Sequence, residues 1–122
     1  MEADLGDRNI VLEKTMDFAV RIVNLYKYLV SDKSEYVLSK QILRSGTSIG
    51  ANAKEAISGQ SKNDFISKLS ISLKEASETE YWLELLMRTD YIQKREYISL
   101  NRDCVEIIKL LTSIIKTSKE NR

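Results

Sequence analysis

The sequence predicts an all-α protein, folded as an antiparallel up-down-up-down four-helix bundle. Apolar residues recur at three- and four-residue steps through four long stretches, as they do on the buried face of a helix. The 122 residues include no proline and four glycines, so few positions interrupt a helix. Short polar segments separate the stretches, and short connections place consecutive helices side by side and antiparallel. We expect helices at about residues 10–30, 36–58, 62–89 and 94–118.

Composition indicates the class of protein and argues against several kinds of chemistry. Hydrophobic residues make up 43% and charged residues 30% of the chain, which is typical of one globular domain. The net charge of +1 gives no overall attraction to nucleic acid or to a membrane. The polar N-terminus and the single cysteine lead us to expect a cytoplasmic protein. The chain has no histidine, which removes the usual dimetal site of helical bundles and the base of a catalytic triad, so we expect no enzyme activity, metal or cofactor.

The first expected helix, residues 10–30, follows a polar leader at residues 1–9 that we expect to be flexible. A second apolar row flanks its main stripe and makes the apolar arc wider than one helix pair requires. We therefore predict that this helix also contacts another subunit, through Phe18, Ile22 and Leu25. The main stripe consists of Leu12, Met16, Ala19, Val23, Tyr26 and Val30, and the second row of Phe18, Ile22, Leu25 and Leu29.

Small residues dominate the second expected helix, residues 36–58. Gly46, Gly50 and Ala53 share one side of it, which predicts that a neighbouring backbone approaches closely there. Each internal glycine costs roughly 1 kcal/mol of helix propensity relative to alanine, so packing must compensate. Gly59 follows the helix and can adopt the left-handed conformation that ends many helices.

Ser61 predicts the start of the third helix, residues 62–89, because its hydroxyl can accept a hydrogen bond from a backbone N–H of the first turn. Asp64 favours the positive end of the helix dipole. Ile71, Trp82 and Leu85 lie off the main apolar stripe of this helix. A half-exposed tryptophan resting on its own helix is one interpretation of this pattern. We favour a subunit contact, because tryptophan is enriched at the centres of interfaces.

The fourth expected helix, residues 94–118, carries Cys104 on its inward apolar row. We expect a buried, unreactive thiol, because the chain has no histidine to activate it. Residues 119–122 form a polar tail.

Two further groups of polar residues are candidates for a role. Carboxylates on the second and third helices are expected to pair with nearby amide or basic groups for structural reasons, since a partly buried carboxylate needs a partner. Basic residues on the same helices form a local positive surface that a symmetric oligomer would repeat around its axis. The polar pairing group is Asn52, Glu55, Glu78 and Glu80, and the candidate nucleic-acid contacts are Lys40, Arg44, Lys54, Lys62, Lys68 and Lys74.

Several segments resemble the bacterial four-helix-bundle family of the 23S rRNA intervening-sequence protein. They are QILRSGTSIGANAKEA at residues 41–56, SKNDF at residues 61–65, Glu78-x-Glu80 and Asp90-Tyr91-Ile92. The resemblance covers nearly the whole chain. It implies a cytoplasmic, non-enzymatic bundle that assembles as a homopentamer around a central channel. It also implies association with nucleic acid or a nucleic-acid enzyme, since relatives include accessory proteins of diversity-generating retroelements.

Together these observations predict a homo-oligomeric scaffold, a pentamer on the strength of the resemblance, that contacts RNA or a nucleic-acid enzyme through repeated basic residues. The alternative is a protein-only adaptor or regulatory partner that binds no nucleic acid. Salt-dependent retention of RNA distinguishes the two.

Overall fold

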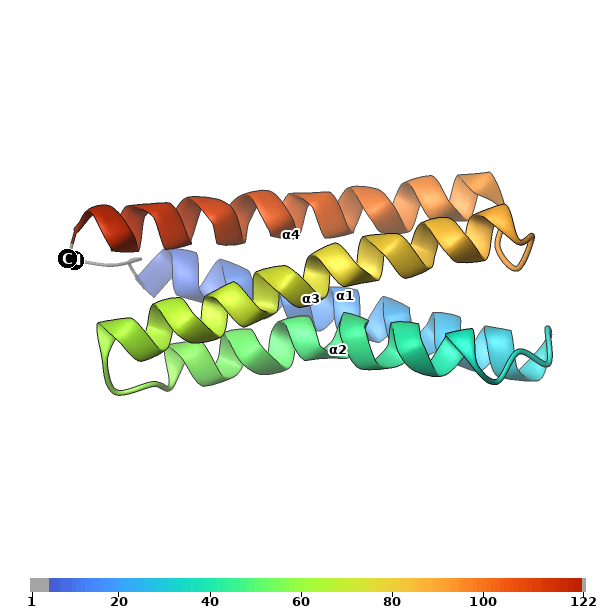
Figure 1. The fold of residues 1–122 in the computed structure, drawn as a ribbon, viewed down its shortest axis with the longest axis horizontal. Helices are drawn as coiled ribbons and strands as arrows, with labels where there is room; N and C mark the ends of the chain where they lie inside the picture. Colours follow the sequence, from blue (N-terminus) through green and yellow to red (C-terminus); the bar gives the residue numbers. More distant parts are fainter. Residues whose placement is uncertain (1–4, 122) are drawn as a thin grey trace.

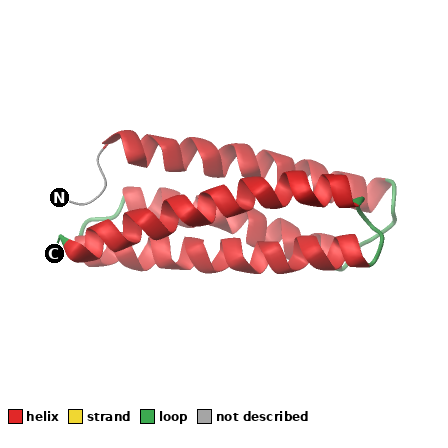
Figure 2. Ribbon diagram, turned by 90° about the horizontal axis from the view of Figure 1, so that it is seen from above, coloured by secondary structure: helices red, strands yellow, loops and turns green. Residues whose placement is uncertain are grey.

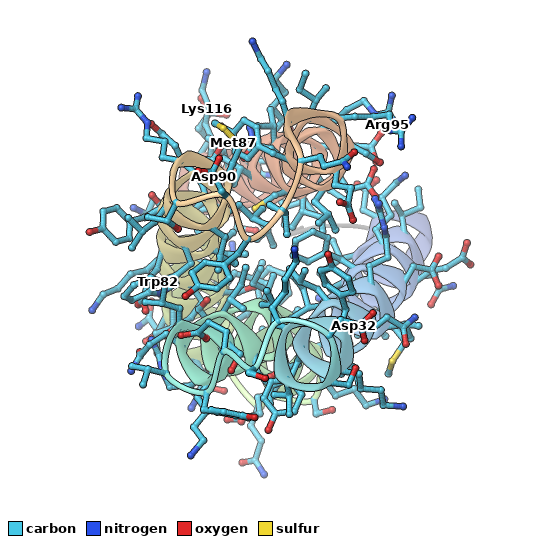
Figure 3. The ribbon with its side chains drawn as sticks, turned by 90° about the vertical axis from the view of Figure 1, so that its right-hand side faces the viewer. Asp32, Trp82, Met87, Asp90, Arg95 and Lys116 are labelled. Atoms are coloured by element: carbon cyan, nitrogen blue, oxygen red, sulfur yellow. The ribbon has the colours of Figure 1, made fainter. Side chains whose placement is uncertain are left out.

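The computed structural model describes residues 5–121 and confirms the four-helix bundle. The helices are α1 (Leu5–Ser31), α2 (Leu38–Ile57), α3 (Lys62–Arg88) and α4 (Lys94–Glu120). Consecutive helices run antiparallel and are joined by short turns (Figures 1 and 2). Viewed along the bundle, α1 and α3 occupy opposite corners, and α2 and α4 occupy the other two (Figure 3).

The first and last helices are longer than the sequence predicts. Helix α1 begins at Leu5, so residues 5–9 of the expected flexible leader are helical, while residues 1–4 lie outside the described residues. Asp7 in the first turn favours this early start, because a carboxylate stabilises the positive end of the helix dipole. Helix α4 continues through Lys119 and Glu120 of the expected polar tail. The Lys62 ammonium donates to the Asn121 carbonyl at 2.7 Å and connects the end of α4 to the start of α3.

The core lies along the bundle axis, and α1 contributes the second of its two apolar rows to it. Phe18, Ile22 and Leu25 are 2%, 0% and 6% exposed in the single chain, so their prediction as an oligomer interface is wrong. These side chains face inward because α1 packs between α2 and α4, and one wide apolar arc serves both neighbours. The row that the sequence indicated as the main stripe consequently lies outside the core, with Met16 on the surface.

Helices α1 and α2 approach closely at the two glycines, as predicted. A Cβ atom added to Gly46 would lie 2.7 Å from Cγ1 and 2.8 Å from Cγ2 of Ile22. At Gly50 the nearest atom would be Oγ1 of Thr15, at 3.2 Å. The absence of side chains therefore sets the distance between these helices, and the packing gained offsets the low helix propensity of glycine.

The turns contain one predicted cap and two departures from prediction. The Ser61 hydroxyl accepts a hydrogen bond from the Asp64 N–H at 3.0 Å, which confirms the expected start of α3. Gly59 does not adopt the left-handed conformation, and Ser34 and Asp90 have positive φ angles instead, at 51° and 66°. The unpredicted cap is the Glu35 carboxylate, which accepts hydrogen bonds from three consecutive backbone N–H groups before and within the first turn of α2. The donors are Val37 at 3.2 Å, Leu38 at 3.0 Å and Ser39 at 2.6 Å.

Candidate interaction surfaces

Apolar side chains are exposed or partly exposed along the outer side of α3, with Lys74 and Glu78 between them, and we call this group the α3 stripe. It consists of Ile71, Tyr81, Trp82 and Leu85, of which Ile71 is 39% and Tyr81 is 61% exposed. The Trp82 indole N–H donates to the Glu78 carboxylate at 3.0 Å, and the Tyr81 ring meets the indole edge-on with centroids 5.0 Å apart. Trp82 is half-buried on the outer side of α3 (Figure 3). The predicted off-stripe position of Ile71, Trp82 and Leu85 therefore corresponds to a real surface of the single chain.

A second apolar strip lies on α1, and we call it the α1 stripe. Met16 and Val20 are 64% and 52% exposed, and Leu12 and Val23 beside them are half-buried. Their spacing places all four on one side of the helix, facing away from the core. The sequence indicated Leu12, Met16 and Val23 as an apolar row but assigned that row to the bundle interior. Helices α1 and α3 are at opposite corners of the bundle (Figure 3), so the outward faces that carry the two stripes point away from each other.

The six predicted nucleic-acid contacts do not form one positive surface. Arg44 pairs with Glu75, with Nη1 to Oε1 at 3.2 Å, and also with Glu78. Lys68 pairs with Glu55 at 3.0 Å, and this hydrogen bond raises the pKa of the Lys68 ammonium. Lys62 donates to the end of α4 as described above.

The remaining three predicted contacts, Lys40, Lys54 and Lys74, are exposed. Lys40 and Lys54 lie about 21 Å apart along α2, at ~1.5 Å per residue. Lys74 projects from the outer side of α3. These three lysines are therefore dispersed over two helices rather than gathered at one place.

Two of the four residues predicted to form polar pairs make ion pairs between α2 and α3. Glu55 pairs with Lys68, and Glu78 accepts from both Arg44 and the Trp82 indole. The Asn52 amide instead donates to the Ser48 carbonyl within α2, at 2.8 Å.

Glu80 lies apart from the Glu55 and Glu78 pairs. It is half-buried on α3, and within residues 5–121 it has no hydrogen-bond or ion-pair partner. Its charge contributes to raising the pKa of Tyr97 and of Cys104, although burial is the larger cause at both. Among the described residues, no group of carboxylates, cysteine or histidine is arranged to hold a metal ion.

Cys104 is fully buried, as the sequence predicts. Its thiol donates to the Ala76 carbonyl on α3, with sulfur and oxygen 3.3 Å apart. Burial raises the pKa of this thiol to about 12, so at neutral pH it carries no thiolate to act as a nucleophile.

A pocket that the sequence did not predict opens at the end of the bundle, where the α1–α2 and α3–α4 turns meet. We call it the end pocket; its volume is about 370 Å³. Lys33 lines it from the α1–α2 turn and Lys94 from the first residue of α4, and the Lys33 ammonium lies 6.0 Å from the ring centroid of Tyr28. Figure 3 views the molecule from this end. The lining residues are Tyr28, Lys33, Met87, Asp90, Tyr91, Ile92, Gln93 and Lys94.

The arrangement of helices and surfaces defines a class of protein: a histidine-free, all-α four-helix bundle with apolar stripes on two opposite faces. None of the helices, over their described residues, is long and apolar enough to cross a membrane. The model of the 23S rRNA-intervening sequence protein family matches residues 7–113, and the chain belongs to that family.

The chain is similar to the crystal structure of a protein of unknown function from the S23 ribosomal protein family of Bacteroides thetaiotaomicron. The two are 65% identical with a TM-score of 0.90, over 91% of this chain and 99% of the other. Among curated proteins, none matches this chain.

Proposed function

We propose that this protein is a non-enzymatic cytoplasmic scaffold that assembles as a homo-oligomeric ring, a pentamer as its family resemblance implies. The observation that carries this proposal is the presence of two different apolar stripes on opposite sides of one chain. A surface that pairs with itself generates a two-fold dimer, whereas two different complementary surfaces generate a ring when the rotation closes. We propose that the α3 stripe of one subunit packs on the α1 stripe of the next.

Charges beside the stripes support this pairing. Lys74 lies next to the α3 stripe, and Glu13 and Asp17 lie next to the α1 stripe. Within residues 5–121 none of these three side chains has an ion-pair partner, so each is available to a neighbouring subunit. Opposite charges at the rim of an apolar contact favour the correct register more than they add affinity.

Native mass spectrometry and analytical ultracentrifugation at micromolar concentration test the ring. Ile71→Glu and Met16→Glu place a charge in the α3 and α1 stripes respectively, and each should convert the oligomer to a monomer. Ile98→Glu is the matched control, because Ile98 is 53% exposed on α4, away from both stripes. A monomeric wild-type protein, or a wild-type dimer with two-fold symmetry, would contradict the head-to-tail ring.

Mixing the two interface variants gives a sharper test of the head-to-tail contact. The Ile71→Glu chain retains a working α1 stripe, and the Met16→Glu chain retains a working α3 stripe. Together they can form one intact contact, so we expect a one-to-one heterodimer from two monomeric variants. Failure of the mixture to associate would show that the two stripes do not bind each other.

We further propose that the ring contacts RNA or a nucleic-acid enzyme through basic side chains that the symmetry of the assembly repeats. A second candidate function is a protein-only adaptor, and the ion pairs that neutralise Arg44 and Lys68 favour it. Retention of single-stranded RNA that weakens steeply with salt would support the first function. Absence of such retention, with an intact ring, would support the second.

A further inference from the structure

We propose that the end pocket binds single-stranded nucleic acid, with an unstacked base against Tyr28 and Tyr91 and the adjoining phosphates held by Lys33 and Lys94. This inference rests on the nucleic-acid contact proposed above and assigns it to a place that the sequence did not indicate. It moves the contact from the sides of α2 and α3 to the end of the bundle.

The composition of the pocket fits a base and its phosphates. Met87 and Ile92 provide apolar surface beside the half-buried rings of Tyr28 and Tyr91. A volume of about 370 Å³ lies in the range of small-ligand sites, which combine an apolar or aromatic lining with a few polar groups. Stacking on aromatic rings combined with cationic contacts to the backbone is how many proteins hold single strands.

The lysines of the pocket differ from four basic residues on the sides of the bundle that are held in ion pairs. Lys14, Arg21, Arg44 and Lys68 each pair with a carboxylate of a neighbouring helix. Lys33 and Lys94 have no ion-pair partner among residues 5–121, and the Lys33 ammonium lies over the Tyr28 ring. Their charges are therefore available to a bound anion.

Acidic groups near the pocket do not remove this positive character. The Asp32 carboxylate does not line the pocket, and it accepts a hydrogen bond from the Ser31 hydroxyl at 2.6 Å. Asp90 lines the pocket from the α3–α4 turn and is the one carboxylate among its described lining residues, against two lysines. The start of α4 contributes little, because Gln93 and Glu96 already form a capping box there.

A base enters this pocket only if it is unstacked and unpaired, since its ring must lie against the tyrosines. The pocket therefore favours single strands over duplexes. In a ring built from lateral contacts between α1 and α3, the helix ends stay uncovered. Rotational symmetry then repeats the end pocket on one rim of the ring, so one strand can engage several subunits.

The experiment measures binding of a fluorescent, mixed-sequence single-stranded RNA of about 12 nucleotides to the assembled full-length protein over a range of salt concentrations. Replacing Lys33 and Lys94 together by alanine removes two phosphate contacts. Each phosphate contact contributes about 0.7 to the slope of log affinity against log salt, so losing two contacts should reduce the slope by about 1.4. Relative to 1 M salt, a slope change of this size corresponds to a loss of affinity of about 25-fold at 0.1 M salt. The matched control replaces Lys109 and Lys116 by alanine, which removes the same charge from exposed positions on α4 outside the pocket and should leave affinity within about twofold.

A second pair of variants tests stacking. Tyr91→Phe keeps the aromatic ring and should bind RNA like the wild type, whereas Tyr91→Leu should weaken binding about tenfold. Thermal unfolding of both variants identifies any loss of structure, and native mass spectrometry confirms that each remains assembled.

The outcomes separate this inference from the function on which it rests. If the wild type binds RNA and the Lys33 and Lys94 variant binds equally well, the end pocket is not the site and the nucleic-acid function stands. If the wild type shows no salt-dependent binding, both the pocket and the nucleic-acid function are wrong, while the ring is judged by its own test. If Tyr91→Leu has no effect, or a glutamate-rich peptide displaces the RNA with equal affinity, the pocket binds acidic polymers in general and the base-stacking site is wrong.

Discussion

Adding one methyl group at Gly46 tests whether the closeness of α1 and α2 is set by that glycine. In Gly46→Ala the new Cβ would lie 2.7 Å from Cγ1 of Ile22, whereas ordinary contacts begin at 3.4 Å, so the helices must separate by about 0.7 Å. Ile22 is completely buried, so any shift of its side chain is made against the surrounding packed core. Overpacking of this kind costs up to about 3 kcal/mol, and the gain in helix propensity returns about 1 kcal/mol. We therefore expect a net loss of about 2 kcal/mol, or about 8 °C in the unfolding midpoint for a chain of this length.

The assay is thermal and urea unfolding at one fixed protein concentration, because association would otherwise shift the apparent stability. Gly50→Ala is the matched control, since its Cβ would meet Oγ1 of Thr15 at 3.2 Å, and we expect a change of less than about 0.5 kcal/mol. In a double-mutant cycle with Ile22→Ala, the added methyl should fill part of the vacated space. The double variant should therefore be more stable than additivity predicts by about 2 kcal/mol. Equal stabilities of the two glycine variants, or strict additivity in the cycle, would refute the reasoning.

Three further predictions concern caps and the buried thiol. Ser61→Ala should lower the free energy of unfolding by about 1 kcal/mol in urea titrations, because the Asp64 N–H loses its acceptor; a Ser61→Asp control should retain stability. Burial tends to raise the pKa of Glu35, but the N–H groups of Leu38, Ser39 and Val37 and the Ser39 hydroxyl together lower it below its ordinary value of 4.5. Glu35→Gln should therefore cost about 1–2 kcal/mol near pH 7. Since a lowered carboxylate pKa stabilises the fold above the unfolded value, this difference should shrink as pH falls through the folded pKa, and a difference that persists at pH 2 would contradict the cap. The Cys104 thiol should resist a thiol-modifying disulfide reagent in the folded protein at pH 8 and react within minutes in urea, and rapid reaction of the folded form would contradict its burial.

Helix positions were largely predictable from the sequence, because they depend on local period, capping and the scarcity of helix-breaking residues. The start of α3 at Lys62 follows from the Ser61 hydroxyl, a local signal within one turn. The cap of α2 was not predicted, because Glu35 precedes the helix by three residues and acts through a turn whose shape depends on the positive φ angle of Ser34. Helix ends at Leu5 and Glu120 were missed because polar sequences can continue a helix without adding to its apolar period.

The candidate surfaces were only partly predictable. Ile71, Trp82 and Leu85 were identified from their angular positions on α3, and the structure places them on its outer side. The end pocket was missed because Lys33 and Lys94 are far apart in the chain, one in the α1–α2 turn and the other beside the α3–α4 turn. Antiparallel packing of the helices brings these two parts of the chain together, and no local sequence pattern predicts that they are close in space.

The sequence by itself determined that the chain forms four amphipathic helices, since the spacing of apolar residues specifies which side chains share a face. It also determined that two of the glycines permit close approach of a neighbour. Only the tertiary structure decided which of the two apolar rows of α1 enters the core and which remains on the surface. The physical reason is that burial depends on the positions of the helices that pack around α1. The row containing Phe18 and Ile22 faces both α2 and α4, whereas the row containing Met16 faces neither.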